Sequence, residues 1–100
     1  MSTEIRYEEK TKVILKPPSK WKVIFLNDDS TPMEFVVELL TTVFNHTPSS
    51  ASKLTMEIHE TGSGIAGIYS HEIAEQRGID ATLISQRNNY PLQITIEEDN

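Results

Sequence analysis

Residues 21–40 read WKVIFLNDDSTPMEFVVELL, and the fold that we predict is determined by this stretch. Its first six residues are rich in β-forming side chains and predict a central strand that is apolar on both faces. The polar run Asn27–Ser30 ends that strand as a turn. Thr31 then supplies a helix N-cap, Pro32 the first helical position and Glu34 the acid of a capping box.

Two helices are expected after this turn. The first should end near Asn45, because apolar side chains recur behind the cap at intervals of three and four residues. These side chains are Met33, Val36, Val37, Leu40, Val43 and Phe44. Thr47 followed by Pro48 repeats the start signal, and Gly62 supplies the stop of a second helix.

The remainder of the chain predicts a strand, a helix and a strand. Residues 65–69 are the strand, and Ser70 caps a helix that runs to about Asn88 and could bend at Gly78. The inward side chains of that helix would be Ile73, Ala74, Ala81 and Ile84. The alternation over residues 92–97 predicts a last strand with one face in water. This β-α-α-β-α-β order predicts an α+β fold, with three helices packed on one face of a small antiparallel three-stranded sheet.

Length and charge limit the class of protein. The chain has 100 residues, which is enough for one core. Fifteen acidic and nine basic residues give a net charge of −6, which argues against a nucleic-acid partner. The absence of cysteine excludes disulfides and thiolate zinc sites. No apolar run has the roughly 18 residues of a membrane helix, and the charged start does not resemble a signal peptide. We therefore expect a cytoplasmic protein with no membrane partner.

The first residues differ in composition from the rest. Residues 1–16 mix charges around one apolar triplet, Val13–Leu15, and Pro17–Pro18 interrupts any regular structure. We expect residues 1–18 to be a flexible N-terminal extension and residues 19–97 to be the folded domain. The extension either has no role or becomes ordered only on a partner.

Three patterns that could indicate a cofactor or a metal do not have the required context. Residues 62–67 match G-x-G-x-x-G, but they follow a helix and enter a strand, the reverse of a dinucleotide site. The acidic turn at 27–31 is followed by proline where a calcium loop needs glycine. His46, His59 and His71 are too far apart for a helical zinc pair. We expect no cofactor and no metal, and we expect the first and last of these histidines to be exposed.

Three side chains on the predicted helices each allow two interpretations. His59 follows Thr55 by four residues, so the two share a helix face. Thr55 could bond to a carbonyl of its own helix, or it could line a cavity. Met33 could be a core side chain or part of an adaptable binding surface. No nucleophile in a recognisable motif such as G-x-S-x-G accompanies the histidine.

Five segments together match the pattern of one known protein family, namely Pro17–Pro18 before Trp21–Ile24, Asn27–Val36, Ile58–Gly62, Glu72–Glu75 and Tyr90–Leu92. On these segments, the chain from Pro17 to Ile96 resembles the ClpS family of adaptor proteins. Members of this family bind substrates that have a destabilising N-terminal residue, and they deliver them to a Clp-type AAA+ unfoldase for proteolysis. The resemblance therefore implies an adaptor and not an enzyme.

The resemblance implies a binding site for the substrate N-terminus. Asn27, Asp29 and His59 would hold its α-amino group, which presents three donors and a positive charge. A hydrophobic pocket would take a large first side chain such as Leu, Phe, Tyr or Trp, and Met33 would exclude β-branched residues. The pocket residues implied by the family are Thr31, Met33, Val36, Thr55, Ile58 and Leu92. Thr55 departs from the family pattern, in which a methionine is usual, and this bears on pocket depth and polarity.

For delivery, the resemblance implies a monomer that docks on the N-terminal domain of a ClpA- or ClpC-like unfoldase. The matching positions are Glu72 and Arg77 on the third helix. Two alternatives remain open at this point. A diverged member could dock on the unfoldase without binding N-degrons, an alternative that Thr55 supports. A hydrolase could instead use His59 with the Asp28–Asp29 turn, and this is the weaker alternative.

Overall fold

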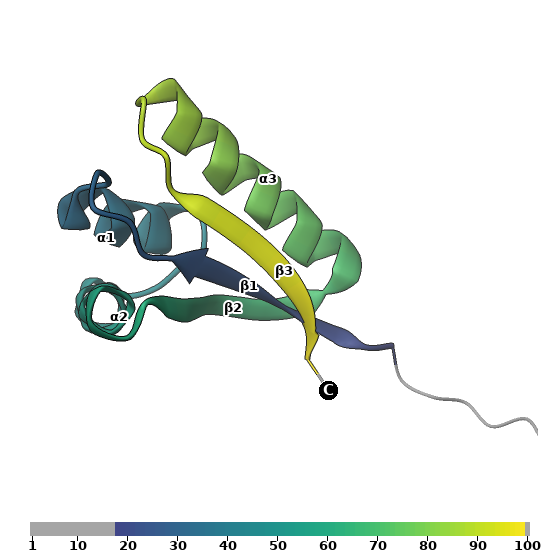
Figure 1. Ribbon diagram of the computed structural model, residues 1–100. Coiled ribbons are helices and arrows are strands. Elements are labelled where there is room, and N and C mark those ends of the chain that lie inside the picture. The colour runs from purple at the N-terminus through teal and green to yellow at the C-terminus, as the bar shows by residue number, and fades with distance from the viewer. Residues whose placement is uncertain (1–17, 100) are drawn as a thin grey trace, which may run out of the picture.

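The protein is described by a computed structural model for residues 18–99, and within this range six elements follow the predicted order (Figure 1). They are β1 Lys20–Leu26, α1 Met33–Thr42, α2 Pro48–Thr61, β2 Ser63–Ser70, α3 His71–Arg87 and β3 Gln93–Asp99. The predicted α+β class and element order are confirmed. The expected flexible extension, residues 1–18, lies outside the described residues except for its last position.

The sheet is antiparallel with the strand order β2-β1-β3, so β1 is central, as its apolar sequence predicts. Val23 and Phe25 have no solvent exposure, because both belong to the hydrophobic core cluster with residues of the helices. Their partners on β3 are Ile96 and Ile94. The intervening side chains of each strand point to the opposite face of the sheet.

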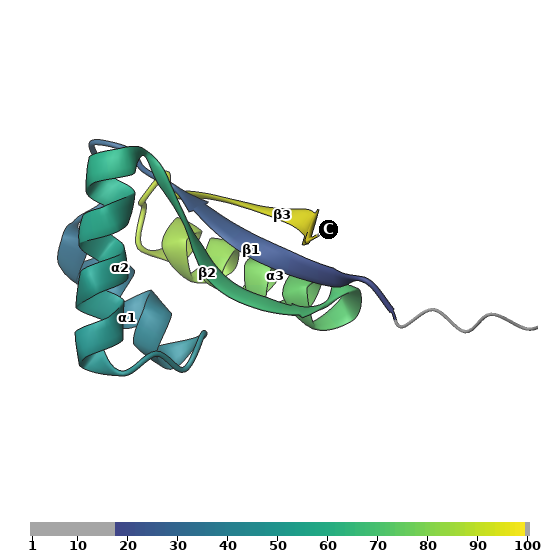
Figure 2. The ribbon, with the colours of Figure 1, turned by 90° about the horizontal axis from the view of Figure 1, so that it is seen from below.

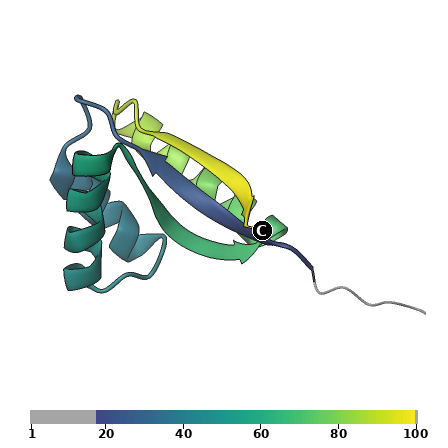
Figure 3. The ribbon, with the colours of Figure 1, turned by 60° about the horizontal axis from the view of Figure 1, so that its bottom comes forward.

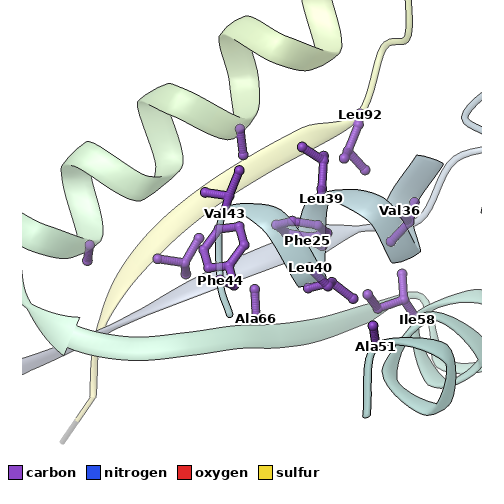
Figure 4. Close-up of a cluster of buried hydrophobic side chains, with 13 residues drawn as sticks. Phe25, Val36, Leu39, Leu40, Val43, Phe44, Ala51, Ile58, Ala66 and Leu92 are labelled. Atoms are coloured by element: carbon purple, nitrogen blue, oxygen red, sulfur yellow. The ribbon is translucent and has the colours of Figure 1, made fainter. Parts of the chain in front are cut away.

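The helices pack against the same side of this sheet in two groups. α3 runs along the face of the sheet, whereas α1 and α2 lie together at one end of it (Figures 1 and 2). The core forms where the two groups meet, and Phe25 lies there among Leu39, Leu40 and Phe44 (Figure 4). The rings of Phe25 and Phe44 meet edge to face with centroids 5.4 Å apart, a favoured aromatic geometry.

The connection between α1 and α2 contains a histidine that is not exposed as predicted. α1 ends at Thr42 rather than near Asn45, whose backbone takes the left-handed conformation with φ 60°. The half-buried ring of His46 then bridges two elements, with Nδ1 2.9 Å from Ser50 Oγ and Nε2 2.7 Å from the carbonyl oxygen of Ala66. His46 therefore fixes the start of α2 against β2.

α3 is continuous from His71 to Arg87, so the expected bend at Gly78 does not occur. Its inner stripe consists of small buried residues, namely Ala74, Gly78, Ala81 and Ser85. Small side chains let the helix lie close to the sheet, so larger apolar side chains are left on its flanks. Ile73, which we predicted to face inward, is accordingly 44% exposed.

Candidate functional site

A cavity of about 160 Å³ opens where β1 ends, α1 begins and α2 ends. We call it the α1–α2 cavity. Its lining residues are Asn27, Asp28, Asp29, Thr31, Met33, Val36, Thr55, Ile58 and His59. The structure therefore brings together, in one hollow, all of the predicted substrate-binding residues except Leu92.

Backbone hydrogen bonds explain why residues distant in sequence meet here. The amide of Asn27, just after β1, donates to the carbonyl oxygen of Gly62 at 2.9 Å. Gly62 ends α2 in the left-handed conformation with φ 99°, and its own amide donates to the carbonyl of Ile58 at 2.9 Å. The loop after β1 is thus held beside the last turn of α2, which includes His59.

Asp28 shapes this loop with its own carboxylate, a role that our sequence analysis did not assign. Its oxygens accept from the amides of Ser30 and Thr31 and from the Thr31 hydroxyl, each at 2.8 Å. The predicted capping box between Thr31 and Glu34 does not form, because the helix begins one residue later than predicted. The N-cap of α1 is Pro32, without a side-chain cap.

The inner wall of the cavity is buried and largely apolar. Val36, Thr55 and Ile58 are 6%, 4% and 3% exposed, whereas Met33 lies at the mouth and is 37% exposed. The Thr55 hydroxyl donates to the carbonyl of Ala51 at 2.8 Å, so its polar group is satisfied within its own helix. Both interpretations of Thr55 therefore hold, since it bonds back to α2 and also lines the cavity.

The rim of the cavity is polar and exposed. Asn27, Asp29 and His59 are all solvent-accessible, and no side-chain hydrogen bond joins them to one another within residues 18–99. An amide oxygen, a carboxylate and a neutral imidazole nitrogen can all accept hydrogen bonds from a bound cation. The two hydroxyls in the lining, those of Thr31 and Thr55, donate elsewhere and not to His59. The lining therefore offers acceptors for a ligand but no nucleophile paired with a base.

Leu92 is not among the residues that line the α1–α2 cavity, so its implied place in the pocket wall stays a prediction. It is 7% exposed and belongs to the hydrophobic core, and it also borders a different hollow with Gln86 and Tyr90. Its apolar character in sequence fits the core and a pocket wall equally well.

Glu72 and Arg77 are on different sides of α3. Glu72 is exposed in the first turn, whereas Arg77 is half-buried, with its Cζ atom 5.8 Å from the centroid of the Tyr69 ring. Positions five apart on a helix are separated by about 140° around its axis. The two residues implied for unfoldase docking therefore do not form one compact patch.

No group of three or more His, Cys, Asp or Glu side chains within residues 18–99 is arranged to hold a metal ion. In the same range, no helix has the length and apolarity that crossing a membrane requires.

Comparison with known proteins identifies the family. The model of a family described as "ATP-dependent Clp protease adaptor protein ClpS" matches residues 16–95. The ATP-dependent Clp protease adapter protein ClpS of Clostridium acetobutylicum is 41% identical over an alignment of 100 positions, which covers 98% of this chain and 99% of that protein. The protein of the same name from Maricaulis maris is 40% identical over 90 residues, or 90% of this chain and 83% of that protein.

A solved structure agrees with this family and with the fold. The structure of Agrobacterium tumefaciens ClpS2 bound to L-phenylalaninamide matches with a TM-score of 0.80 and 34% sequence identity. The match covers 83% of this chain and 100% of that chain. The proteins of this family are adaptors and not enzymes, so the hydrolase alternative is set aside. The chain belongs to the ClpS family, the adaptor proteins of the ATP-dependent Clp protease.

Proposed function

We propose that the α1–α2 cavity binds the first residue of N-degron substrates, taking the free α-amino group at its rim and a large hydrophobic side chain inside. The composition of the α1–α2 cavity supports this proposal most directly. Its rim has exposed hydrogen-bond acceptors, and its interior has buried, largely apolar walls. The ligand named for Agrobacterium tumefaciens ClpS2, L-phenylalaninamide, has a free amino group and a phenyl ring, which is the same pair of features.

The rim supplies what an ammonium group needs. The α-ammonium has three N–H donors, and Asn27, Asp29 and His59 offer three kinds of acceptor around one opening. Hydrogen bonds between charged partners are about twice as strong as neutral ones. Asp28 adds a second negative charge while it holds the loop. An acetylated N-terminus lacks both the charge and most of the donors, and should bind poorly.

The interior supplies the selectivity for large apolar residues. In another protein, a cavity of about 150 Å³ lined by apolar side chains binds benzene, so about 160 Å³ has the size for one ring or a leucine side chain. Burying a Leu or Phe side chain contributes roughly 1.5–3 kcal/mol. Leu, Phe, Tyr and Trp at the first position should therefore be preferred over small or polar residues.

Fluorescence anisotropy with labelled peptides tests this proposal. Saturable binding is expected for peptides that begin with Phe or Leu and have a free amine. The same peptides with an acetylated N-terminus, and peptides that begin with Ile, should bind at least about tenfold more weakly, a difference of about 1.4 kcal/mol. Equal binding of free and acetylated peptides would remove the amine from the recognition. No binding of either would favour a diverged member that docks on the unfoldase without binding N-degrons.

We further propose that the bound substrate is delivered to the N-terminal domain of a ClpA- or ClpC-like AAA+ unfoldase by a monomeric adaptor in the cytoplasm. The contacts would involve Glu72 and Arg77 on α3. The exposure of Glu72 supports its part in this proposal, while the half-buried position of Arg77 beside Tyr69 indicates an indirect part. Degradation of a reporter that begins with Phe, by reconstituted unfoldase and protease, should require the adaptor.

A further inference from the structure

A second hollow, larger than the α1–α2 cavity, lies between α3 and the edge strand β3. We call it the α3–β3 groove; it measures about 270 Å³ and is lined by Glu75, Gly78, Ile79, Thr82, Leu83, Ile94 and Ile96. It forms because Gly78 has no side chain to cover the inward faces of Ile94 and Ile96. None of its lining residues belongs to the α1–α2 cavity.

The groove leaves large apolar side chains in water. Ile79 and Leu83 are each 48% exposed, one turn apart on the same flank of α3. Adjacent exposed apolar side chains of this size indicate an interaction site. They also lie beside an unpaired edge strand, which proteins usually protect from contact with other chains.

The surroundings of the groove are acidic. Glu75 is in its lining, and Glu72 precedes it by three residues on the same helix face. Glu98 lies on β3 in the same inward-facing series as Ile94 and Ile96. No Lys or Arg is among the lining residues. An apolar segment with positively charged neighbours is the complement of such a surface.

This chain contains such a segment outside the described residues. Residues 10–16 read KTKVILK, which places three apolar side chains between lysines, with Lys10 and Lys12 before them and Lys16 after them. No second run of three branched aliphatic residues in this sequence has a lysine directly before it and directly after it.

The segment is close enough in the chain to reach the groove. β1 begins at Lys20, which pairs with Asp99 at the end of β3, so the chain enters the sheet beside this strand (Figure 3). Ile96 pairs with Val23, which is five residues after Pro18, or roughly 17 Å along the sheet. Five residues back from Pro18 to Val13 can also span roughly 17 Å. So short a tether gives an effective concentration on the order of millimolar.

We propose that Val13–Leu15 docks in the α3–β3 groove of its own molecule, with the flanking lysines beside Glu75 and Glu98. The apolar triplet covers Ile79, Leu83 and the inward side of β3. This contact is separate from substrate binding, since it uses neither the rim nor the interior of the α1–α2 cavity.

Paramagnetic relaxation in the full chain tests this contact. The chain has no cysteine, so Thr11→Cys gives one attachment site for a nitroxide label. The methyl signals of Ile79 and Ile96 should lose most of their intensity. Ile65 and Ile68, which are 44% and 47% exposed on the opposite face of the sheet, are the matched controls and should keep theirs. Equal losses on both faces, or none, would overturn the proposal.

A variant and a mixing experiment complete the test. Ile14→Asp should restore the groove signals, whereas Ile5→Asp, the same change further along the tail, should not. A mixture of spin-labelled and separately isotope-labelled chains should show no loss of intensity. Loss in this mixture as strong as within one chain would mean that the groove takes the tail of a second copy, which contradicts docking within one molecule.

Discussion

Met33 is placed to control which first residues enter the α1–α2 cavity, because it lies at the mouth above buried walls. A β-branched residue has two heavy atoms on its β-carbon, immediately beside the amino group that the rim would hold. Met33→Ala should therefore admit peptides that begin with Ile or Val, and raise their affinity by about tenfold or more. Anisotropy titrations with Phe-, Ile- and Val-starting peptides measure this change.

Met56 provides the matched control for this experiment. It is 47% exposed on α2 and does not line the cavity, so Met56→Ala should leave all three affinities unchanged. Identical selectivity in the Met33→Ala variant and the original protein would show that Met33 is not the gate.

His59 supplies one of the three proposed acceptors for the α-amino group of the substrate. A neutral imidazole ring has one nitrogen that can accept a hydrogen bond from an ammonium group. A hydrogen bond to a charged group contributes about 1.5–3 kcal/mol. His59→Ala should therefore bind a Phe-starting peptide about tenfold more weakly or worse, as measured by fluorescence anisotropy.

His71 serves as the matched control, because it is exposed at the start of α3 and outside the cavity. His71→Ala should retain the full affinity for the peptide. An affinity that is unchanged in His59→Ala would remove the His59 ring from the recognition.

At the scale of elements, Gly78 tests how closely α3 lies against the sheet. A methyl group added there would be 3.8 Å from Ile96 Cγ2 and 3.9 Å from Ile94 Cγ2, which is ordinary contact. Alanine is favoured over glycine inside a helix by about 0.8–1.0 kcal/mol. Gly78→Ala should therefore raise the free energy of unfolding by up to about 1 kcal/mol and the melting temperature by roughly 4–8 °C.

Gly64 offers the opposite case within β2. A methyl group there would be 2.7 Å from Ile58 Cγ1 and 2.9 Å from Leu54 Cδ1, too close without movement. Gly64→Ala should cost about 1–3 kcal/mol, in line with other overpacked cores. Thermal unfolding of both variants checks the pair, and a destabilised Gly78→Ala with an unaffected Gly64→Ala would contradict this packing.

The order of the elements could be predicted from sequence because each has its own local signal. Thr47 caps α2 by accepting from the amide of Ser50, and Ser70 caps α3, as predicted. The predictions that were wrong concern the exposure of single side chains, which depends on contacts with other elements. Ile73 is exposed because small residues occupy the inner stripe of α3, and His46 is half-buried because the chain brings Ala66 to it.

The residues that line the α1–α2 cavity were predicted from the family resemblance, and less from chemistry alone. Asn27, Asp29 and His59 are far apart in the chain, and the bond between Asn27 and Gly62 that brings the loop and the helix together has no sequence signature. Asp28 was overlooked because an acid in a polar turn does not reveal which hydrogen bonds it accepts. The α3–β3 groove was also not predicted, since it depends on a glycine facing an edge strand.

At the scale of the whole molecule, substrate binding and the proposed docking face lie at opposite ends. The α1–α2 cavity is beside the start of β2, whereas α3 begins after its end, roughly 25 Å away for a strand of eight residues. Glu72→Lys should therefore lower delivery to the unfoldase without changing peptide affinity. Rates of reporter degradation, measured beside anisotropy, separate the two steps.

Glu38→Lys, a charge reversal at an exposed position on α1, is the control for this variant. It should leave delivery unchanged, and equal losses in both variants would indicate a general charge effect rather than a docking contact. Glu72 also lies on the helix face that borders the α3–β3 groove, so delivery assays should be repeated with Ile14→Asp.

The measurement that tests the central claim most directly is nuclear magnetic resonance mapping of L-phenylalaninamide on the full chain, with N-acetyl-L-phenylalaninamide as the matched ligand. The account predicts saturable shifts that are confined to the α1–α2 cavity, including the amides of Asn27, Thr55 and His59, and no such shifts with the acetylated compound. Shifts centred on the α3–β3 groove, which is the larger apolar hollow, or equal shifts with both ligands, would contradict it.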